Sequence, residues 1–110
     1  MPVTLFVSNP CNGDVALVEG TQSNVERLRD DGRLDVRARI DATGTGQLTG
    51  DQYRLTIDTG SRSVPDKARF SFDQRFVVDN RSGGPDFTAR FVLRFVNGEP
   101  TATVDDQRCK

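Results

Sequence analysis

The chain has 110 residues, a length that predicts one domain, residues 1–110, with a single hydrophobic core. Its formal net charge of −1 and its lack of histidine argue against a general affinity for nucleic acid or anionic membranes and remove the commonest catalytic base. No apolar run is long enough to span a membrane, and the first ten residues lack the basic and apolar regions of a signal peptide.

Apolar and polar residues alternate along most of the chain, as in strands that have one face on a core and one in water. The first such segment is VTLFVS, at residues 3–8. Residues 15–29 and 34–42 flank the turn sequence DDGR and predict a hairpin. Because the apolar positions of residues 15–29 change parity, we expect a bulge near 25–28 or a bend that involves Gly20.

Three further alternating segments follow. Their apolar positions are Tyr53, Leu55 and Ile57; Ala68, Phe70, Phe72, Phe76 and Val78; and Phe87, Ala89, Phe91, Leu93 and Phe95. Turn sequences separate the segments: TGTG at 43–46, TGSRSVPDK at 59–67, NRSGGPD at 80–86 and NGEP at 97–100. The seven phenylalanines are expected to supply much of the core volume, because the chain has no tryptophan and only one tyrosine.

The pattern predicts an all-β fold with seven to eight antiparallel strands in a meander. We expect a small closed β-barrel, because closure removes the exposed edges of strands rich in Phe and Val. A two-sheet β-sandwich is the alternative.

The only two cysteines, Cys11 and Cys109, lie near the two ends of the chain. Without histidine they do not suffice for an ordinary zinc site or for a cysteine–histidine catalytic pair. A disulfide, two free thiols or intermolecular pairing remain. We predict the Cys11–Cys109 bridge, which requires the chain ends to be neighbours, and with it an oxidising compartment, secreted or at the cell surface. Met1 is then native or takes the place of a removed signal peptide.

Several short motifs occur in a familiar order: NPCNGD at 9–14, EGT at 19–21, TGTGQLTGDQYR at 43–54 and TATVDDQRC at 101–109. In these landmarks the chain resembles a group of small secreted bacterial proteins of the actinobacterial type, which have no assigned function. The resemblance implies export, a β-rich fold and a terminal cysteine pair. Members of that group tend to carry histidines near positions 22–40, where this chain has other polar residues, so no metal role is implied here.

No catalytic constellation is predicted. Acid–base chemistry would fall to carboxylates, Tyr53 or Lys67, and adjacent carboxylates on a strand point to opposite faces. The glycines at 44, 46 and 50 are not followed by the lysine and helix of a phosphate loop. We therefore predict no enzyme activity, no metal and no cofactor.

Two binding surfaces are conceivable. Arginines on the outward parity could form a cationic ladder for a polyanion such as an extracellular polysaccharide: Arg37, Arg39, Arg54, Arg90 and Arg94. Alternatively, these arginines pair with neighbouring aspartates. Gln74 has inward parity and could point into a cavity with Tyr53, Phe70, Phe72, Phe76 and Phe91.

The sequence thus favours a secreted or surface-associated binding or structural module, with a protein, a polysaccharide or a small apolar ligand as partner and no nucleic acid. One alternative is a barrel that binds an apolar small ligand, of the lipocalin or cyclase kind. Another is an assembly subunit in which the strand VTLFVS pairs with another copy.

Overall fold

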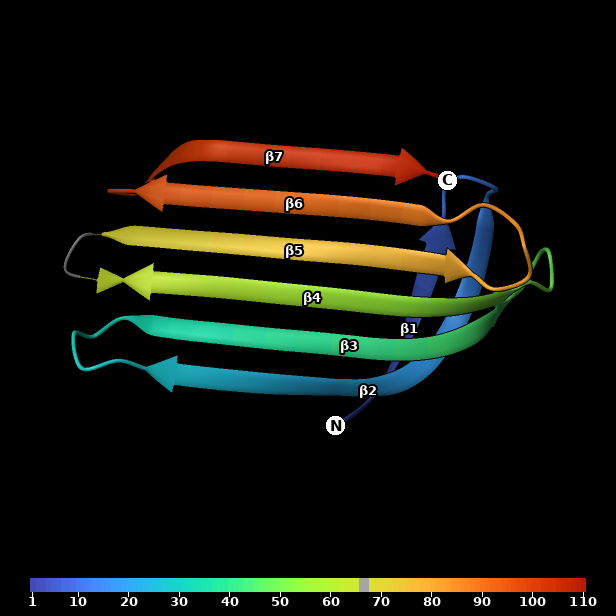
Figure 1. The fold of residues 1–110 in the computed structure, drawn as a ribbon, viewed down its shortest axis with the longest axis horizontal. Coiled ribbons are helices and arrows are strands. Elements are labelled where there is room, and N and C mark those ends of the chain that lie inside the picture. Colours follow the sequence, from blue (N-terminus) through green and yellow to red (C-terminus); the bar gives the residue numbers. More distant parts are fainter. Residues whose placement is uncertain (66–67) are drawn as a thin grey trace.

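The computed structural model of the chain describes residues 1–65 and 68–110, with the side chains of these residues except 102–104. The strands are β1 (Pro2–Asn9), β2 (Asp14–Leu28), β3 (Leu34–Gly46), β4 (Gln52–Val64), β5 (Arg69–Asn80), β6 (Phe87–Val96) and β7 (Glu99–Cys109). They form one antiparallel sheet in chain order (Figure 1). The predicted all-β meander is confirmed, including the hairpin around DDGR.

The sheet is not closed, so the expected barrel is not confirmed. In the part of the chain that the structure describes, β1 pairs only with β2 and β7 only with β6. β1 and the first half of β2 instead cross one face of the sheet as a hairpin (Figure 1). This covering hairpin packs on the apolar core of the sheet and supplies a second layer at one end only.

Gly20 lies where β2 leaves the covering hairpin and continues into the main sheet. A Cβ atom at Gly20 would overlap the backbone of Asp41 and Ala42 in β3. Glycine therefore lets two backbones approach more closely than any other residue would. The predicted bulge near 25–28 is absent, because β2 and β3 keep a continuous register from Ala16 to Leu28.

Two predicted turns belong to strands. TGTG at 43–46 lies within β3, and a Cβ atom at Gly44 would overlap the backbone of Leu17. These glycines serve close packing of β2 on β3, and the chain turns after Gly46 instead. The segment 59–67 is strand as far as Val64, and residues 66 and 67 lie outside the described part.

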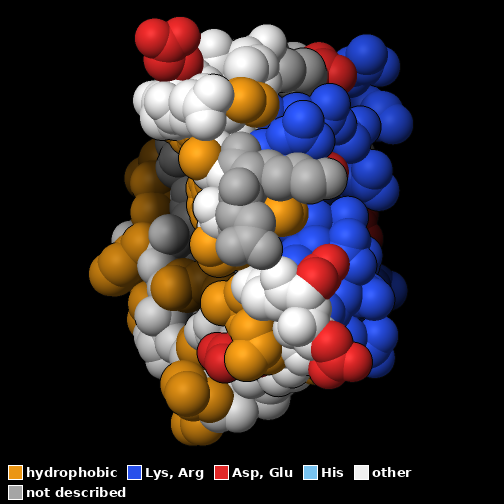
Figure 2. All heavy atoms as spheres, turned by 90° about the vertical axis from the view of Figure 1, so that its left-hand side faces the viewer, with side chains coloured by type: hydrophobic (Ala, Val, Ile, Leu, Met, Phe, Trp, Pro, Cys, Tyr) orange, Lys and Arg blue, Asp and Glu red, His pale blue; other side chains and the backbone are white. Residues whose placement is uncertain are grey.

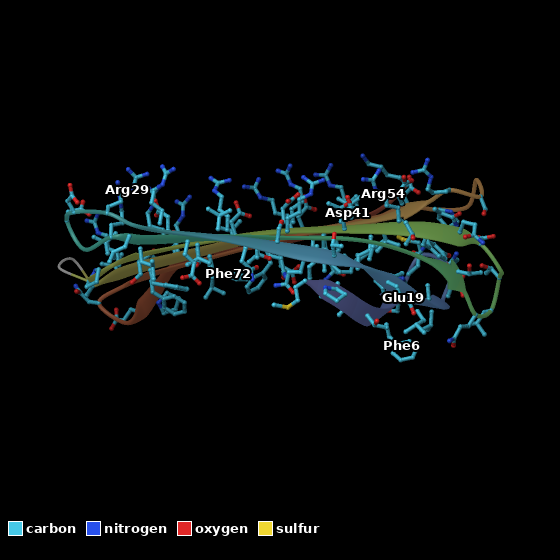
Figure 3. The ribbon with its side chains drawn as sticks, turned by 90° about the horizontal axis from the view of Figure 1, so that it is seen from below. Phe6, Glu19, Arg29, Asp41, Arg54 and Phe72 are labelled. Atoms are coloured by element: carbon cyan, nitrogen blue, oxygen red, sulfur yellow. A yellow bond between two sulfur atoms is a disulfide. The ribbon has the colours of Figure 1, made fainter. Side chains whose placement is uncertain are left out.

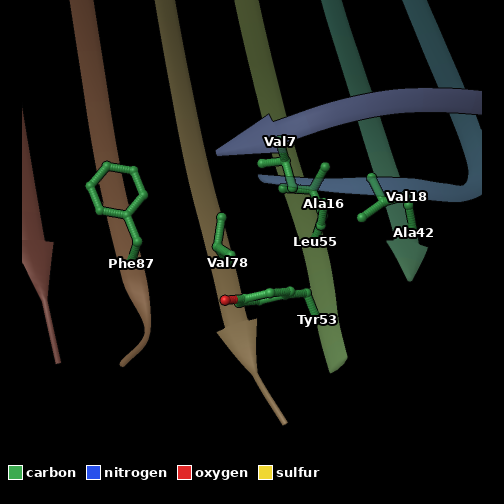
Figure 4. Packing of buried hydrophobic residues seen from close by; sticks show 8 residues of the cluster. All are labelled: Val7, Ala16, Val18, Ala42, Tyr53, Leu55, Val78 and Phe87. Atoms are coloured by element: carbon green, nitrogen blue, oxygen red, sulfur yellow. The ribbon is translucent and has the colours of Figure 1, made fainter. Parts of the chain in front are cut away.

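The core sits between the covering hairpin and the sheet (Figure 4). Its buried apolar residues are Val7, Ala16, Val18, Ala42, Tyr53, Leu55, Val78 and Phe87. The expectation that the seven phenylalanines supply much of the core volume is wrong: Phe87 belongs to the buried core, whereas Phe6, Phe70 and Phe91 are exposed. The reason is geometric, since most phenylalanines lie where the hairpin does not reach.

Candidate functional site

The strand register sorts the side chains of the main sheet onto two faces, because directly paired residues point to the same side. One face packs under the covering hairpin and is called the core face here. The other is called the arginine face, and its arginines are Arg27, Arg37, Arg39, Arg54, Arg62, Arg69, Arg75, Arg90, Arg94 and Arg108. Figure 3 shows Arg29 and Arg54 on the side of the sheet opposite Phe72.

All five arginines predicted for a polyanion surface lie on the arginine face. Two cross-strand rows organise it. One row runs Arg39, Asp58, Arg75 and Arg90, and the next but one runs Asp35, Arg62, Ser71 and Arg94. Sequence reasoning missed Arg62, because it was assigned to a turn. No apolar–polar alternation marks this position, since its neighbours on the core face are Ser61 and Ser63.

Aspartates neutralise part of this face. Asp35 accepts hydrogen bonds from Arg62, at 2.8 Å, and from Arg29, at 3.1 Å. Arg90 lies 3.2 Å from Asp73, and Arg39 lies 3.8 Å from Asp58. Exposed pairs of this kind stabilise a fold little, so their main effect is on the surface charge. The predicted alternative of paired arginines and aspartates therefore applies to some of the arginines.

Arg54 and Asp41 form the one two-pronged ion pair of the described residues, through Nε at 3.1 Å and Nη2 at 2.9 Å. The hydrogen bond from Arg54 lowers the pKa of Asp41, and the same bond raises the pKa of Arg54. The pKa of Asp35 is likewise lowered, first by its hydrogen bond from Arg62. These carboxylates stay charged over the whole physiological range.

Of the seven arginines outside the ion pairs of residues 1–65 and 68–110, four lie close together on the arginine face: Arg27, Arg37, Arg75 and Arg94. They surround a shallow hollow of about 750 Å³, whose lining includes eight arginines and three aspartates. Gly60 lies in this lining, and a Cβ atom on it would meet nothing within 4 Å. The arrangement is an open cationic depression.

The six residues of the predicted cavity all have positions on the core face, but in two places. Tyr53 and Phe76 lie at the end covered by the hairpin, where Tyr53 is 2% exposed. Gln74, Phe70, Phe72 and Phe91 lie beyond the hairpin. Phe70 and Phe91 are 41% and 36% exposed there, so this group lines an open surface.

Tyr53 belongs to a polar network under the hairpin. Its hydroxyl donates to Asp14 Oδ2 at 2.9 Å and accepts from Asn12 Nδ2 at 2.9 Å. Asp14 also accepts bonds from the Thr49 hydroxyl and from the backbone amides of Leu48 and Val15. The Thr49 bond leads the effects that lower the pKa of Asp14 to about 2. The network holds the turn between β1 and β2 to the turn after β3. Both the Asp14 carboxylate and the Tyr53 hydroxyl are hydrogen-bonded within it.

Cys11 and Cys109 form the predicted disulfide, with their Cα atoms 5.7 Å apart. It joins the turn of the covering hairpin to the end of β7. No group of three His, Cys, Asp or Glu within the described residues is placed to hold a metal ion. Lys67, named as a potential acid–base group, lies outside these residues.

Within residues 1–65 and 68–110 there is no helix long and apolar enough to cross a membrane. Comparison with protein-family models, with curated proteins and with solved structures finds no match to this chain. The resemblance to small secreted bacterial proteins therefore stays a prediction. The two faces of the sheet are the features of this chain that bear on its function.

Proposed function

We propose that the protein is a secreted or surface-associated binding module without catalytic activity, and that its arginine face binds an extended polysaccharide bearing carboxylate or sulfate groups. The observation that carries this proposal is the hollow around Gly60, where eight arginines outnumber three aspartates. A chain of net charge −1 that concentrates cations on one face creates a local field for anions.

The placement of the arginines favours an anionic ligand. Arg75 and Arg90 are direct cross-strand partners, and like charges opposite each other destabilise a sheet. An anion between them removes that repulsion. Guanidinium groups also bind carboxylate and sulfate oxygens through two parallel hydrogen bonds, which gives both strength and direction.

The same face favours a polysaccharide over a nucleic acid. Proteins that bind single-stranded nucleic acid combine cations with aromatic side chains on which bases stack. Among the described residues of β2–β6, the aromatic side chains lie on the core face, with none between the arginines. The disulfide supports an oxidising location, such as the outside of the cell.

The absence of catalysis is supported by how the polar groups are used. Asp14 and Tyr53 hold each other and the neighbouring turns, and Asp35 and Asp41 of the arginine face are ion-paired. General acid–base catalysis needs a group whose pKa lies near the working pH. The pKa of Asp14, at about 2, is far from that range.

Gly60 offers a direct test, because its replacement adds a side chain to the hollow without a steric clash. Gly60→Asp places a carboxylate among the arginines, and Gly60→Asn places a neutral side chain of the same size there. With polygalacturonate as the carboxylate probe and dextran sulfate as the sulfate probe, we expect Gly60→Asp to bind roughly 10-fold more weakly, about 1.4 kcal/mol. Gly60→Asn should stay near wild-type affinity.

Calorimetric titration at low salt and at about 1 M salt, where the screening length falls to ~3 Å, completes the experiment. Wild-type affinity should fall steeply with salt, and neutral dextran should not bind. Equal affinity of Gly60→Asp and Gly60→Asn, or binding that ignores salt, contradicts the proposal. A single-stranded DNA probe that binds more tightly than both polysaccharides also contradicts it.

A further inference from the structure

The core face is only half covered. Beyond the covering hairpin it presents seven large apolar side chains, called the phenylalanine surface here: Leu28, Leu34, Phe70, Phe72, Phe91, Leu93 and Phe95. Phe70 packs on Phe95 and Phe72 on Phe91, with ring centroids 6.3 and 6.2 Å apart. In Figure 2, apolar side chains gather on one side of this end of the molecule and arginines on the other.

A protein sheet is normally covered by a second layer on its apolar face. This chain is 16 Å along its shortest axis and 50 Å along its longest, and its radius of gyration is 16.5 Å. A compact domain of this length has a radius of about 13 Å. The shape is that of a sheet with part of its second layer missing.

The exposed area leads to the same conclusion. The chain exposes 7163 Å². A compact monomer of its mass, 12.2 kDa, exposes about 6,100 Å². The excess of about 1,000 Å² exceeds the ~800 Å² that each partner buries in a stable interface of standard size.

We propose that a second copy of this chain covers the phenylalanine surface. The charges around it fit a copy of itself better than a lipid surface. The core face carries Glu26 and Asp105 near its margins, on β2 and β7, and its central strands place no arginine there. Anionic lipids repel acidic margins, whereas two copies can keep these side chains at the wet rim of the interface.

The covering hairpin stands above the sheet at one end of the molecule only, and this restricts the orientations in which two copies can pack face to face. The covering hairpin stands away from the sheet, and Phe6 points outward from it on the same side as Phe72 (Figure 3). Phe6 and Leu17 are cross-strand partners on this outer surface, 70% and 38% exposed. If both hairpins lay at the same end of the pair, they would hold the two phenylalanine surfaces apart.

A two-fold axis that runs in the plane between the sheets, across the strands, avoids this conflict. It places the covering hairpin of each copy on the phenylalanine surface of the other. Phe6 and Leu17 then pack on Phe72 and Phe91, and each sheet gains a complete second layer. Both arginine faces stay on the outside of the pair, so the dimer does not depend on the proposed polysaccharide.

The test is the mass in solution, measured by sedimentation equilibrium and light scattering at roughly 100 μM, far above the Kd of ordinary stable interfaces. Wild type should be a dimer. Phe91→Glu and Phe6→Glu change exposed side chains of the two contacting surfaces, and each should weaken dimerisation by roughly 100-fold or more. Val25→Glu, a 63% exposed apolar position on the arginine face, is the control and should stay dimeric.

Circular dichroism and protection of both cysteines from alkylation check that each variant is folded. Should Phe91→Glu fail this check, Phe6→Glu carries the test, because Phe6 is the more exposed of the two. A monomeric wild type, or a dimer unaffected by either folded variant, overturns the proposal. So does a wild type that sediments with anionic lipid vesicles in place of dimerising.

Discussion

At the scale of single residues, Asp14 shows how a buried charge can be held without a cation. It is 1% exposed, and the hydrogen bonds that it accepts come from two hydroxyl groups and two backbone amides. Burial alone would raise the pKa of a carboxyl group, but these bonds outweigh burial and lower it to about 2. Asp14 is thus the point that fixes the hairpin turn to the turn after β3.

This pKa predicts how stability changes in acid. The unfolded carboxyl group titrates near 3.8 and the folded one near 2, so the unfolded chain binds more protons in between. The contribution of Asp14 is therefore complete above pH 4 and is lost as the pH falls from about 4 to 2. In urea titrations over this range, Asp14→Asn should lack this part of the pH dependence and should already be less stable at pH 7.

Asp30→Asn is the matched control, since Asp30 is exposed in the turn between β2 and β3. It should follow the wild-type curve closely. If Asp14→Asn keeps the full wild-type loss of stability between pH 4 and 2, then other carboxylates cause that loss, and the role given to the Asp14 network is wrong.

At the scale of elements, Gly20 decides whether the covering hairpin can form. By strand propensity, Val is a better residue than Gly in a strand interior, so propensity alone predicts that Gly20→Val stabilises the protein. The structure predicts the reverse, because the Cβ atom would overlap the backbone of Asp41 and Ala42. We expect a loss of roughly 1–3 kcal/mol in the free energy of unfolding.

Gly60→Val separates packing from propensity, because the space around Gly60 is open. This variant should be as stable as wild type or more so, by up to about 1 kcal/mol. Urea unfolding of both variants measures the difference. Equal stability of Gly20→Val and Gly60→Val would mean that β2 can move away from β3 at little cost.

The glycines of this sheet show which structural features a local sequence pattern can predict and which it cannot. Alternation predicted the strands and the face of each side chain, because the period of two is a local property of the backbone. The placement of Gln74 and of the five predicted arginines followed from it. Alternation could not predict that TGTG is strand, since the close approach of Leu17 to Gly44 is a contact between strands.

At the scale of the whole molecule, the sequence could not reveal how much of the core face is covered. The apolar positions of Phe70, Phe72 and Phe91 look the same whether they face the chain's own second layer or another molecule. Barrel closure was expected on the ground that strand edges should be satisfied. The chain instead joins its ends through the Cys11–Cys109 disulfide. Each of the outer strands, β1 and β7, keeps one edge that pairs with no strand of the described chain.

In a closed barrel, backbone pairing would join the first strand to the last. Here the disulfide holds the two ends of the chain together instead. It closes a loop across a separation of 98 residues and joins the covering hairpin to β7, to which β1 is not paired. Constraining so long a loop in the unfolded chain is worth about 4–5 kcal/mol in the chain-entropy model. This is a large part of the ~5–15 kcal/mol that a small domain has in total.

We expect the Cys11→Ser, Cys109→Ser double variant to lose most of that amount in urea unfolding. β1 should loosen first, because it is an edge strand that pairs with β2 alone, and without the bridge the hydrogen bond from Asn9 Nδ2 to the Pro85 carbonyl, at 2.9 Å, holds its end to the loop between β5 and β6. Amide hydrogen exchange should then rise most in β1, while Ala16–Thr21 of β2, β4 and β5 stay protected by partner strands on both sides. Uniform loss of protection would instead mean that the hairpin and the sheet unfold as one unit, and that the bridge acts through the unfolded chain alone.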